Sequence, residues 1–266
     1  MPVTGKFRYL EARPRSLARQ ERTLVLIHAF PLNARMWEPQ LALADTGWRV
    51  IAPHFRGTNG GPPEAAVATM DDCAADVIDL LDALHIENAV IGGLSMGGYV
   101  TFALFRHAPR YFRGMVLADT RPQADTPEAA EGRKRLLAVV HEKGAAAVAD
   151  EMLPKLLGET TRRNRPDIVA RVGDLVRSNS ADAIAGAIAA LMSRPDSTSI
   201  LSSIHCPTLI LVGEEDALTP PPLSQDMQRA IGGAELVLVP RAGHLSSIEQ
   251  PEVFNAALAQ FLEHRV

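Results

Sequence analysis

Apolar residues along the chain gather in short unbroken runs, separated by longer stretches in which they recur every three or four positions. Six runs are rich in Val, Ile and Leu, namely residues 23–28, 49–53, 88–93, 113–119, 207–213 and 234–240. Apolar and polar positions do not alternate within them, which is typical of parallel strands buried on both faces. Residues 4–12 predict a further, antiparallel strand at the start of the chain.

The stretches between these runs predict helices. Residues 71–85 carry apolar side chains at helical spacing along one face, and residues 96–107 continue directly from a strand. Residues 251–264 form a terminal helix in which Pro251 suits the first turn. This alternation of strand and helix predicts an α/β fold with a mostly parallel central sheet and helices on both of its faces.

One segment breaks the rhythm, because residues 121–200 contain no run typical of a strand. Capping residues predict helices there instead, with starts at Thr126-Pro127, Pro166 and Ser180 and ends at Gly144 and Gly158. We therefore expect a core made of residues 1–120 and 201–266, and a helical cap, or lid, made of residues 121–200. A helical excursion that covers no site is the alternative.

Composition is that of an ordinary globular protein, with 266 residues, 47% of them hydrophobic and 22% charged. The net charge of −4 indicates neither a nucleic-acid partner nor an anionic membrane surface. No apolar run is long enough to span a membrane, and residues 1–16 lack the apolar region of a secretory signal. We therefore expect a cytoplasmic protein.

Cysteine and histidine spacing gives no sign of a metal site. Cys73 and Cys206 are far apart and form no C-x-x-C pair, so both are interpreted as small buried hydrophobic residues. The eight histidines form no H-E-x-x-H or H-x-H pattern. We expect neither a metal nor a cofactor.

The segment Gly93-Leu94-Ser95-Met96-Gly97 fits the pattern G-x-S-x-G, and it lies between a predicted strand and a predicted helix. In such a turn the serine is held in a strained conformation with its hydroxyl exposed, and side chains at the two glycine positions would clash with neighbouring backbone. The N-terminus of the following helix favours developing negative charge. Ser95 is therefore predicted to be a nucleophile.

A serine hydroxyl is a poor nucleophile at neutral pH, so it needs a general base, and the base needs a group that orients it. Asp216 follows the predicted strand 207–213, and His244 follows the predicted strand 234–240. All three residues are then expected at the carboxyl edge of the sheet, where ligands bind in open α/β folds. The order Ser95, Asp216, His244 is that of one known arrangement of the Ser-His-Asp triad.

Over nearly its whole length the chain resembles an α/β-hydrolase-fold enzyme, and "GLSMGG" resembles the esterase and 3-oxoadipate enol-lactonase-like branch. The segment "LIHAFPLNARMW" resembles the HGxP-type oxyanion loop of that family, with Ala29 in place of the usual glycine. The resemblance implies that the backbone N–H groups of Phe30 and Met96 form the oxyanion hole, and that His28 orients the loop. The resemblance also favours Asp216, rather than the residues next to it, as the acid of the triad. In some members of the fold the acid stands instead at the position of Asp119.

A second departure follows the strand 49–53, where family members often have D-x-R-G-x-G-x-S. This chain has "HFRGTNGGPP", with His54 in place of the acid, so the role of the loop stays open. His54 is interpreted as lying at the surface or behind the site.

The resemblance and the motifs together predict a serine hydrolase for small carboxylic esters or lactones, acting through an acyl-enzyme on Ser95 with His244 as base and Asp216 as orienting acid. The pocket is expected to be mainly hydrophobic and lined by Leu32 and Trp37, although a core position is the alternative for Trp37. A dicarboxylate lactone would require a cation, for which Arg121 and Arg35 are candidates.

Other activities stay open. C–C bond hydrolysis and aminopeptidase action would use the same triad, and Pro31 resembles the cofactor-free perhydrolases of the fold. A non-catalytic ligand-binding protein would keep the pocket, but the complete set of Ser95, Asp216 and His244 argues against it. The expected partner is a small-molecule ester or lactone, without nucleic acid or membrane, and a homo-oligomer remains open.

Overall fold

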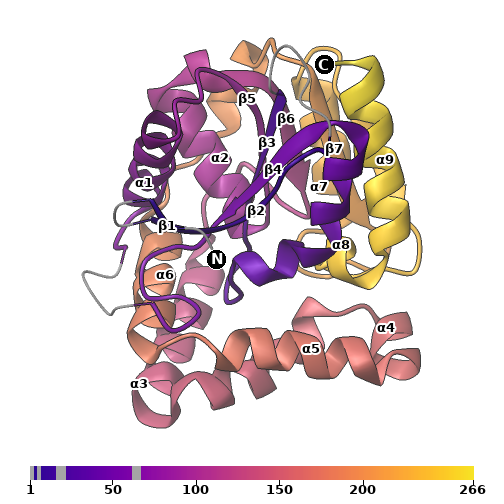
Figure 1. Ribbon diagram of the computed structural model, residues 1–266. Coiled ribbons are helices and arrows are strands. Elements are labelled where there is room, and N and C mark those ends of the chain that lie inside the picture. The colour runs from indigo at the N-terminus through magenta and orange to yellow at the C-terminus, as the bar shows by residue number, and fades with distance from the viewer. Residues whose placement is uncertain (1–2, 5–6, 16–21, 62–66) are drawn as a thin grey trace.

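An eight-stranded sheet forms the centre of the molecule (Figure 1), with strand order β1-β2-β4-β3-β5-β6-β7-β8. The computed structural model describes residues 3–4, 7–15, 22–61 and 67–266. β1 and β2 are joined antiparallel, β2 pairs antiparallel with β4, and all other pairs are parallel. The strands are β1 (Val3–Thr4), β2 (Phe7–Ala12), β3 (Arg22–Ile27), β4 (Trp48–Pro53), β5 (Ala89–Leu94), β6 (Phe112–Ala118), β7 (Thr208–Gly213) and β8 (Glu235–Val239).

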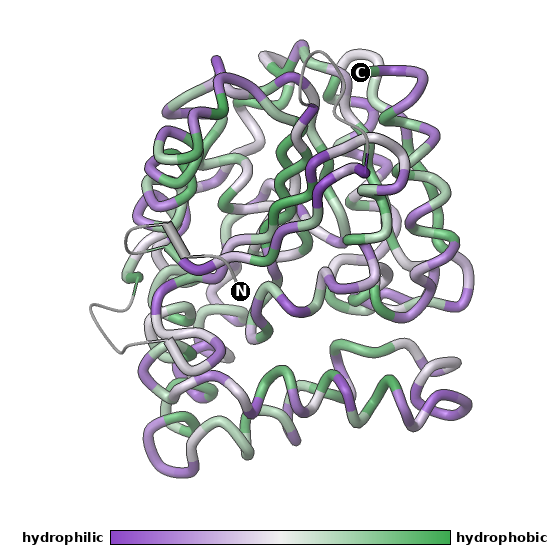
Figure 2. The backbone as a smooth tube through the Cα atoms, viewed as in Figure 1, coloured by the Kyte–Doolittle hydropathy of each residue, from purple (hydrophilic) through white to green (hydrophobic). Residues whose placement is uncertain are grey.

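The six apolar runs in the sequence correspond to the six strands from β3 to β8, and their parallel pairing confirms the predicted α/β sheet. The antiparallel strand expected at residues 4–12 is β2, while residues 5–6 of that prediction lie outside the described residues. β3 to β7 are almost wholly buried, which explains why their sequences are unbroken apolar runs. Figure 2 shows this concentration of hydrophobic residues along the central strands.

Helices cover both faces of the sheet (Figure 1). α1 (Met70–Ala83), α2 (Met96–His107) and α7 (Pro221–Ala230) lie on one face, and the 3₁₀-helix η1 (Ala34–Thr46), α8 (Ser246–Glu249) and α9 (Pro251–His264) lie on the other. Alternate residues of β7 separate these faces, since Ile210 packs in a cluster with Phe102 and Met227 while Leu209 packs in the core that contains Phe254. A short 3₁₀-helix, η2 (Pro109–Tyr111), precedes β6.

Between β6 and β7 the chain forms α3 (Pro127–Leu156), α4 (Glu159–Asn164), α5 (Pro166–Arg177), α6 (Ala181–Ser193) and the 3₁₀-helix η3 (Thr198–Ser203). α3, α4 and α5 lie along one edge of the molecule, at the bottom of Figure 1. Thr126 and Ser180 cap helices as predicted, because their side chains accept hydrogen bonds from the N–H groups of Ala129 and Ala183. Gly144 ends a helix as expected, because its backbone is non-helical, with φ of 72° and ψ of −169°, and it divides α3 into two helical parts.

The two cysteines differ in burial. Cys73 is buried in the core, as expected, whereas Cys206 is only half-buried. Within the part of the chain that the structure describes, no helix combines the length and the apolar character that crossing a membrane requires.

Candidate active site

Ser95 lies in the sharp turn between β5 and α2, with backbone φ of 55° and ψ of −113°. Its N–H donates to the carbonyl of Ala118, and its carbonyl accepts from the hydroxyl of Thr120, both at 2.9 Å. The flanking glycines are required, because a Cβ on Gly97 would lie 2.1 Å from the carbonyl oxygen of Ile27, and one on Gly93 would lie 2.3 Å from the backbone of Gly97. The turn therefore has the strained geometry that the G-x-S-x-G pattern predicts.

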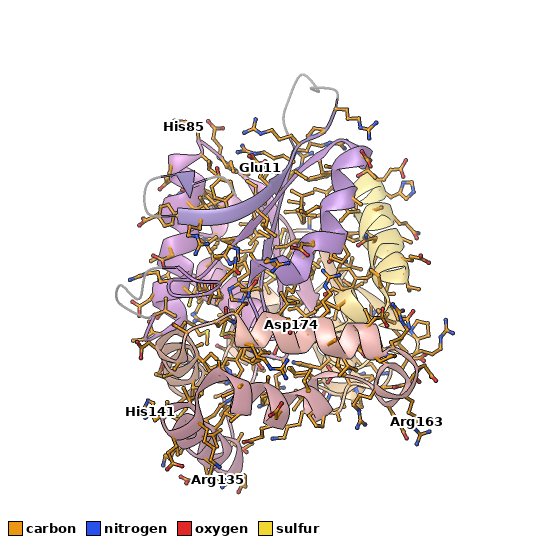
Figure 3. All side chains as sticks on the ribbon, turned by 60° about the horizontal axis from the view of Figure 1, so that its bottom comes forward. Glu11, His85, Arg135, His141, Arg163 and Asp174 are labelled. Carbon is orange, nitrogen blue, oxygen red and sulfur yellow. The ribbon has the colours of Figure 1, made fainter. Side chains whose placement is uncertain are left out.

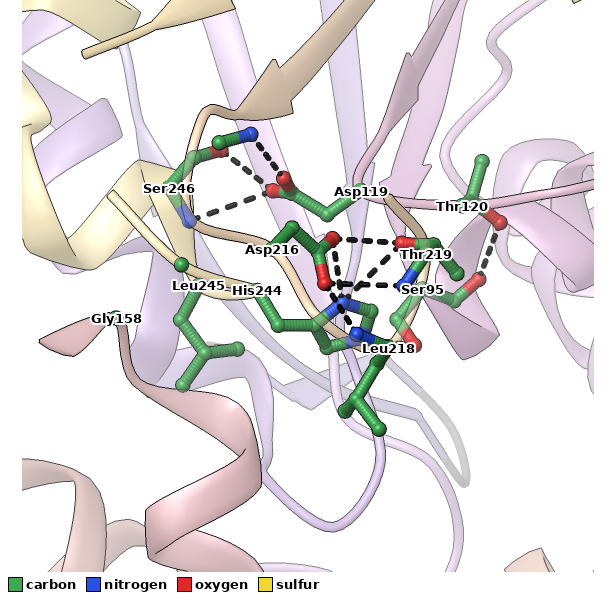
Figure 4. A network of polar contacts seen from close by, with 12 residues as sticks. Ser95, Asp119, Thr120, Gly158, Asp216, Leu218, Thr219, His244, Leu245 and Ser246 are labelled. Atoms are coloured by element: carbon green, nitrogen blue, oxygen red, sulfur yellow. Dashed lines mark hydrogen bonds and ion pairs between the residues drawn. The ribbon is translucent and has the colours of Figure 1, made fainter. Parts of the chain in front are cut away.

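The three residues singled out in the sequence meet at the carboxyl edge of the sheet (Figure 4). Nε2 of His244 lies 2.8 Å from Oγ of Ser95, and Nδ1 of the same ring lies 2.8 Å from Oδ2 of Asp216. His244 and Asp216 are buried, while Ser95 is partly exposed. A hydrogen-bonded chain from carboxylate to imidazole to hydroxyl can transfer the serine proton to the imidazole and stabilise the resulting cation.

Asp216 is held by its own loop. Its Oδ1 accepts hydrogen bonds from the N–H groups of Leu218 and Thr219, and its Oδ2 accepts one from the hydroxyl of Thr219 at 2.7 Å. Burial raises the pKa of Asp216, but the charge of His244 and the hydrogen bonds from His244 and Thr219 outweigh it and bring the pKa to about 2. The carboxyl of Asp216 is therefore ionised at neutral pH.

Asp119, the other position considered for the acid, does not contact the imidazole. It is fully buried, and it accepts hydrogen bonds from the N–H of Gly213 at 2.8 Å and from the N–H and hydroxyl of Ser246. Burial, followed by the nearby charge of Asp216, raises the pKa of Asp119 well above its usual value. Asp119 thus joins the ends of β6 and β7 to the segment after His244 (Figure 4).

The backbone N–H groups of Phe30 and Met96 belong to buried residues beside the Ser95 turn. Among the described residues, no protein acceptor takes a hydrogen bond from either group. Buried N–H groups are rarely left without a partner, so these two donors are available to a ligand oxygen. Phe30 also lines the cavity that contains Ser95.

His28 lies behind this loop. Its Nδ1 lies 3.0 Å from the carbonyl of Ala29, and its Nε2 lies 3.4 Å from the N–H of Phe55, which fixes Nδ1 as the protonated nitrogen. Burial lowers the pKa of His28 to about 4, so the ring is neutral and serves as a link between two loops. His54 is half-buried nearby, and burial lowers its pKa to about 3.

Asn179, between α5 and α6, was not singled out in the sequence. Its Nδ2 donates to the carbonyls of Pro31 and Leu32 at 2.7 and 3.0 Å, and its Oδ1 accepts from the N–H of Asn59 at 2.9 Å. The 31–33 segment, which follows Phe30, is thereby bound to the helical segment between β6 and β7. Oδ1 of Asn179 also accepts from Nδ2 of Asn33 at 3.2 Å. No local signal in the sequence marks Asn179, because these partners lie more than a hundred residues away.

Two acidic side chains make similar links to the loops of the triad. Glu215, next to Asp216, accepts from the N–H of Thr160 at 2.8 Å and from its hydroxyl. Glu249 is buried and accepts from the N–H groups of Gly158, Gly243 and Leu245. The junction of α3 and α4 is therefore bound to both loops.

A cavity of about 350 Å³ opens at Ser95 and His244. Its walls come from Phe30, Tyr99, Leu218 and from α3, which contributes Leu136 and Met152. Apolar side chains make up much of the lining, but it also includes six charged residues that the expectation of a mainly hydrophobic pocket left out: Arg121, Asp125, Arg133, Arg135, Glu151 and Lys155.

Neither residue proposed for the pocket lines this cavity. Trp37 is fully buried in the core, where its ring packs against Phe254 with centroids 6.0 Å apart, so its assignment to the pocket is corrected. Leu32 is also buried, and it lines a separate hollow of about 10 Å³ that shares Phe30. Of the two candidate cations, Arg121 lines the cavity, whereas Arg35 is exposed and pairs with Glu38.

Comparison with known proteins shows the family of the chain. Residues 24–257 match the model of the alpha/beta hydrolase family. The chain is 28% identical over 235 residues to a 3-oxoadipate enol-lactonase of Acinetobacter baylyi, covering 88% of this chain and 86% of that enzyme.

Two solved structures are similar over almost the entire chain. A thermophilic esterase from Thermogutta terrifontis with bound malate is 37% identical and superposes with a TM-score of 0.90, covering 97% of this chain and 93% of the esterase. The enol-lactonase from Burkholderia xenovorans is 25% identical with a TM-score of 0.87, covering 97% and 96% of the two chains.

Proposed function

The chain belongs to the alpha/beta hydrolase family, and from this starting point we propose that it is a serine hydrolase that cleaves small carboxylic esters or lactones. The observation that carries the proposal is the position of His244, whose two ring nitrogens lie 2.8 Å from Ser95 Oγ and 2.8 Å from Asp216 Oδ2 at the base of a cavity. The similar esterase and enol-lactonases support this substrate class.

In the first half of the reaction, Oγ of Ser95 attacks the carbonyl carbon while Nε2 of His244 takes the hydroxyl proton. Asp216 holds the imidazole and stabilises its positive charge. The backbone N–H groups of Phe30 and Met96 bind the oxyanion of the tetrahedral intermediate. The proton then passes from His244 to the leaving alkoxide, which departs as the alcohol and leaves an ester on Ser95.

In the second half, His244 takes a proton from water as the water oxygen attacks this acyl-enzyme. Collapse of the second tetrahedral intermediate returns the proton to Ser95 Oγ and releases the carboxylic acid. In a lactone the alcohol and the acid stay joined, so one hydroxy acid leaves. The helices between β6 and β7 act as the cap, since α3 supplies one wall of the cavity and Asn179, Glu215 and Glu249 join this segment to the catalytic loops.

A graded series of 4-nitrophenyl esters, from acetate to palmitate, tests the proposal with the wild type and Ser95→Ala. Loss of a triad serine is expected to lower kcat by about 10⁶. Hydrolysis of short esters that disappears in Ser95→Ala supports the proposal. Hydrolysis that survives the substitution, or no hydrolysis of any ester, refutes it and leaves C–C bond hydrolysis, perhydrolysis or ligand binding to be examined with the same variant.

A further inference from the structure

One part of the cavity wall is built around a buried carboxylate, that of Asp125. Three guanidinium groups surround it: Arg194 at 2.9 Å, Arg121 at 3.2 Å and Arg133 at 3.3 Å. Burial raises the pKa of Asp125, but the charges of Arg133 and Arg194 outweigh the burial and bring the pKa below its usual value. One negative charge therefore faces three positive ones.

Arg194 is the buried cation of this cluster. It is buried like Asp125, donates to the carbonyls of Leu191 and Gln123, and lies over the ring of Tyr99 at 4.1 Å. One guanidinium group, that of Arg194, is enough to balance the charge of Asp125, so the cluster of Arg121, Arg133, Arg194 and Asp125 keeps two positive charges in excess.

Arg121 and Arg133 both line the cavity and are both partly exposed. Each makes one long contact with Asp125, and Nε of Arg121 is buried without a hydrogen-bond partner among the described residues. The guanidinium of Arg133 also lies 5.8 Å from the centre of the ring of Phe30, beside the candidate oxyanion hole. Two incompletely satisfied guanidinium groups therefore face the same space as Ser95.

The other charged residues of the lining do not cancel this excess. Glu151 and Lys155 pair with each other at 3.2 Å and are substantially exposed. Arg135 adds a further positive charge, and it lies toward the periphery of the molecule (Figure 3). Among the described residues of the lining, Asp125 is paired with the buried Arg194 and Glu151 with Lys155, so the positive charges of Arg121, Arg133 and Arg135 are left in excess.

We infer that the substrate carries a second, free carboxylate, which Arg121 and Arg133 bind while Ser95 attacks the ester or lactone carbonyl; this inference rests on the proposed function. Guanidinium groups bind carboxylates with strong, directional hydrogen bonds, and they do so best where water is partly excluded. A cavity of about 350 Å³ suits a small molecule of this kind. The substrate class is thus the half-esters and lactones of dicarboxylic acids.

Two esters with the same acyl chain test the inference. In 4-nitrophenyl hydrogen adipate the far carboxylate is free, and in methyl 4-nitrophenyl adipate it is capped and neutral, while both release nitrophenolate. We expect the wild type to favour the anionic ester at least about tenfold in kcat/KM, and we expect Arg133→Gln to lower this ratio by about ten- to a hundredfold. Arg121→Gln should act in the same direction.

Because both esters report on the same folded molecules, the ratio is insensitive to partial unfolding of a variant. Arg133→Lys keeps the positive charge but loses the planar guanidinium group, so it should retain part of the preference for the anionic ester. Arg163→Gln is the matched control, since Arg163 lies at the periphery (Figure 3) and pairs with Glu159, and it should leave the ratio unchanged. A ratio near one in the wild type, or a ratio that Arg133→Gln does not change, overturns the inference.

The failure of the inference can be told apart from failure of the proposed function. If the wild type hydrolyses neither ester, the proposed function fails, and calorimetric titration with adipate decides the inference. If the wild type binds adipate and Arg133→Gln does not, the inferred anion site is upheld. If the wild type does not bind adipate, or if Arg133→Gln binds it equally well, the inference is overturned.

Discussion

The carboxylate of Glu249 accepts a hydrogen bond from the backbone N–H of Gly158 at 2.8 Å, across 91 residues of sequence. Its other oxygen accepts from the N–H groups of Gly243 and Leu245, the two neighbours of His244. One buried side chain thus fixes the loop of the candidate base and joins it to the junction of α3 and α4. The position of the helical segment between β6 and β7 is therefore coupled to the position of the imidazole.

Glu249→Ala should lower both stability and kcat. The substitution leaves three buried N–H groups without an acceptor, at about 1–3 kcal/mol each, so we expect the free energy of unfolding to fall by roughly 3 kcal/mol or more. Urea denaturation measures the change. Glu252→Ala removes an exposed carboxylate from the neighbouring helix and is the control. Equal stability of the two variants would contradict the assigned role of Glu249.

Asn179→Ala should impair turnover although Asn179 lies outside the cavity lining. Without its Nδ2 group the 31–33 segment loses two hydrogen bonds and Phe30 is displaced, so kcat on a 4-nitrophenyl ester should fall by up to about 100-fold. Asn179→Asp should fail as well, because a carboxylate cannot donate to the carbonyls of Pro31 and Leu32. Full activity of the aspartate variant would show that these two bonds are dispensable. The exposed Asn164→Ala is the control.

The Asp216 carboxylate should stabilise the fold in a pH-dependent way. Folding lowers the pKa of Asp216 from 3.8 to about 2. The ionised carboxylate therefore adds to the free energy of unfolding above about pH 3.8, and this gain is lost as the pH falls through the folded-state pKa of about 2. The stability difference between the wild type and Asp216→Asn should therefore shrink by about 1 kcal/mol between about pH 5 and about pH 3. Urea denaturation at several pH values tests this. A difference that stays constant, or grows on acidification, would refute the lowered pKa.

Gly97→Ala should destabilise the fold far more than an alanine substitution at a glycine that has free space around it. The new methyl group would lie 2.1 Å from the carbonyl oxygen of Ile27, which is held in β3, so the Ser95 turn would have to shift. We expect a loss of several kcal/mol, as for other overpacked sites, and little folded protein. A methyl group on Gly232 would meet nothing within 4 Å, and Gly232→Ala should melt close to the wild type. Similar melting temperatures for the two variants would refute the close approach.

Much of the fold could be predicted because parallel strands buried on both faces leave unbroken apolar runs in the sequence. The same regularity located the candidate site, since Ser95, Asp216 and His244 each follow such a run and must meet at one edge of the sheet. Helix α7 was not among the predicted helices, although the prolines at its start stand in the cap and first turn, where proline is compatible with a helix. Helix η1 could not be predicted, because Pro39 lies within it and a proline in a helix interior argues against a helix.

The contacts that join the helical segment to the catalytic loops could not be predicted, because they link polar side chains to groups far away in sequence. Nothing near Asn179 or Glu249 indicates which loops they bind. Trp37 was misplaced for a related reason, since an apolar residue next to an oxyanion loop can face either the core or the pocket, and here it packs on Phe254. The charged cavity wall depends on the tertiary structure, which brings Arg133 of α3 and Arg194 at the end of α6 to Asp125.

The central claim is that Ser95 is a nucleophile activated by His244. Diethyl 4-nitrophenyl phosphate tests it most directly, because attack by Oγ on phosphorus displaces nitrophenolate and leaves a stable diethylphosphoryl group on the serine. The account predicts one nitrophenolate released per chain, a modified peptide that contains Ser95 by mass spectrometry, and no labelling of Ser95→Ala. Absence of labelling in the wild type, or labelling at another residue, would contradict it.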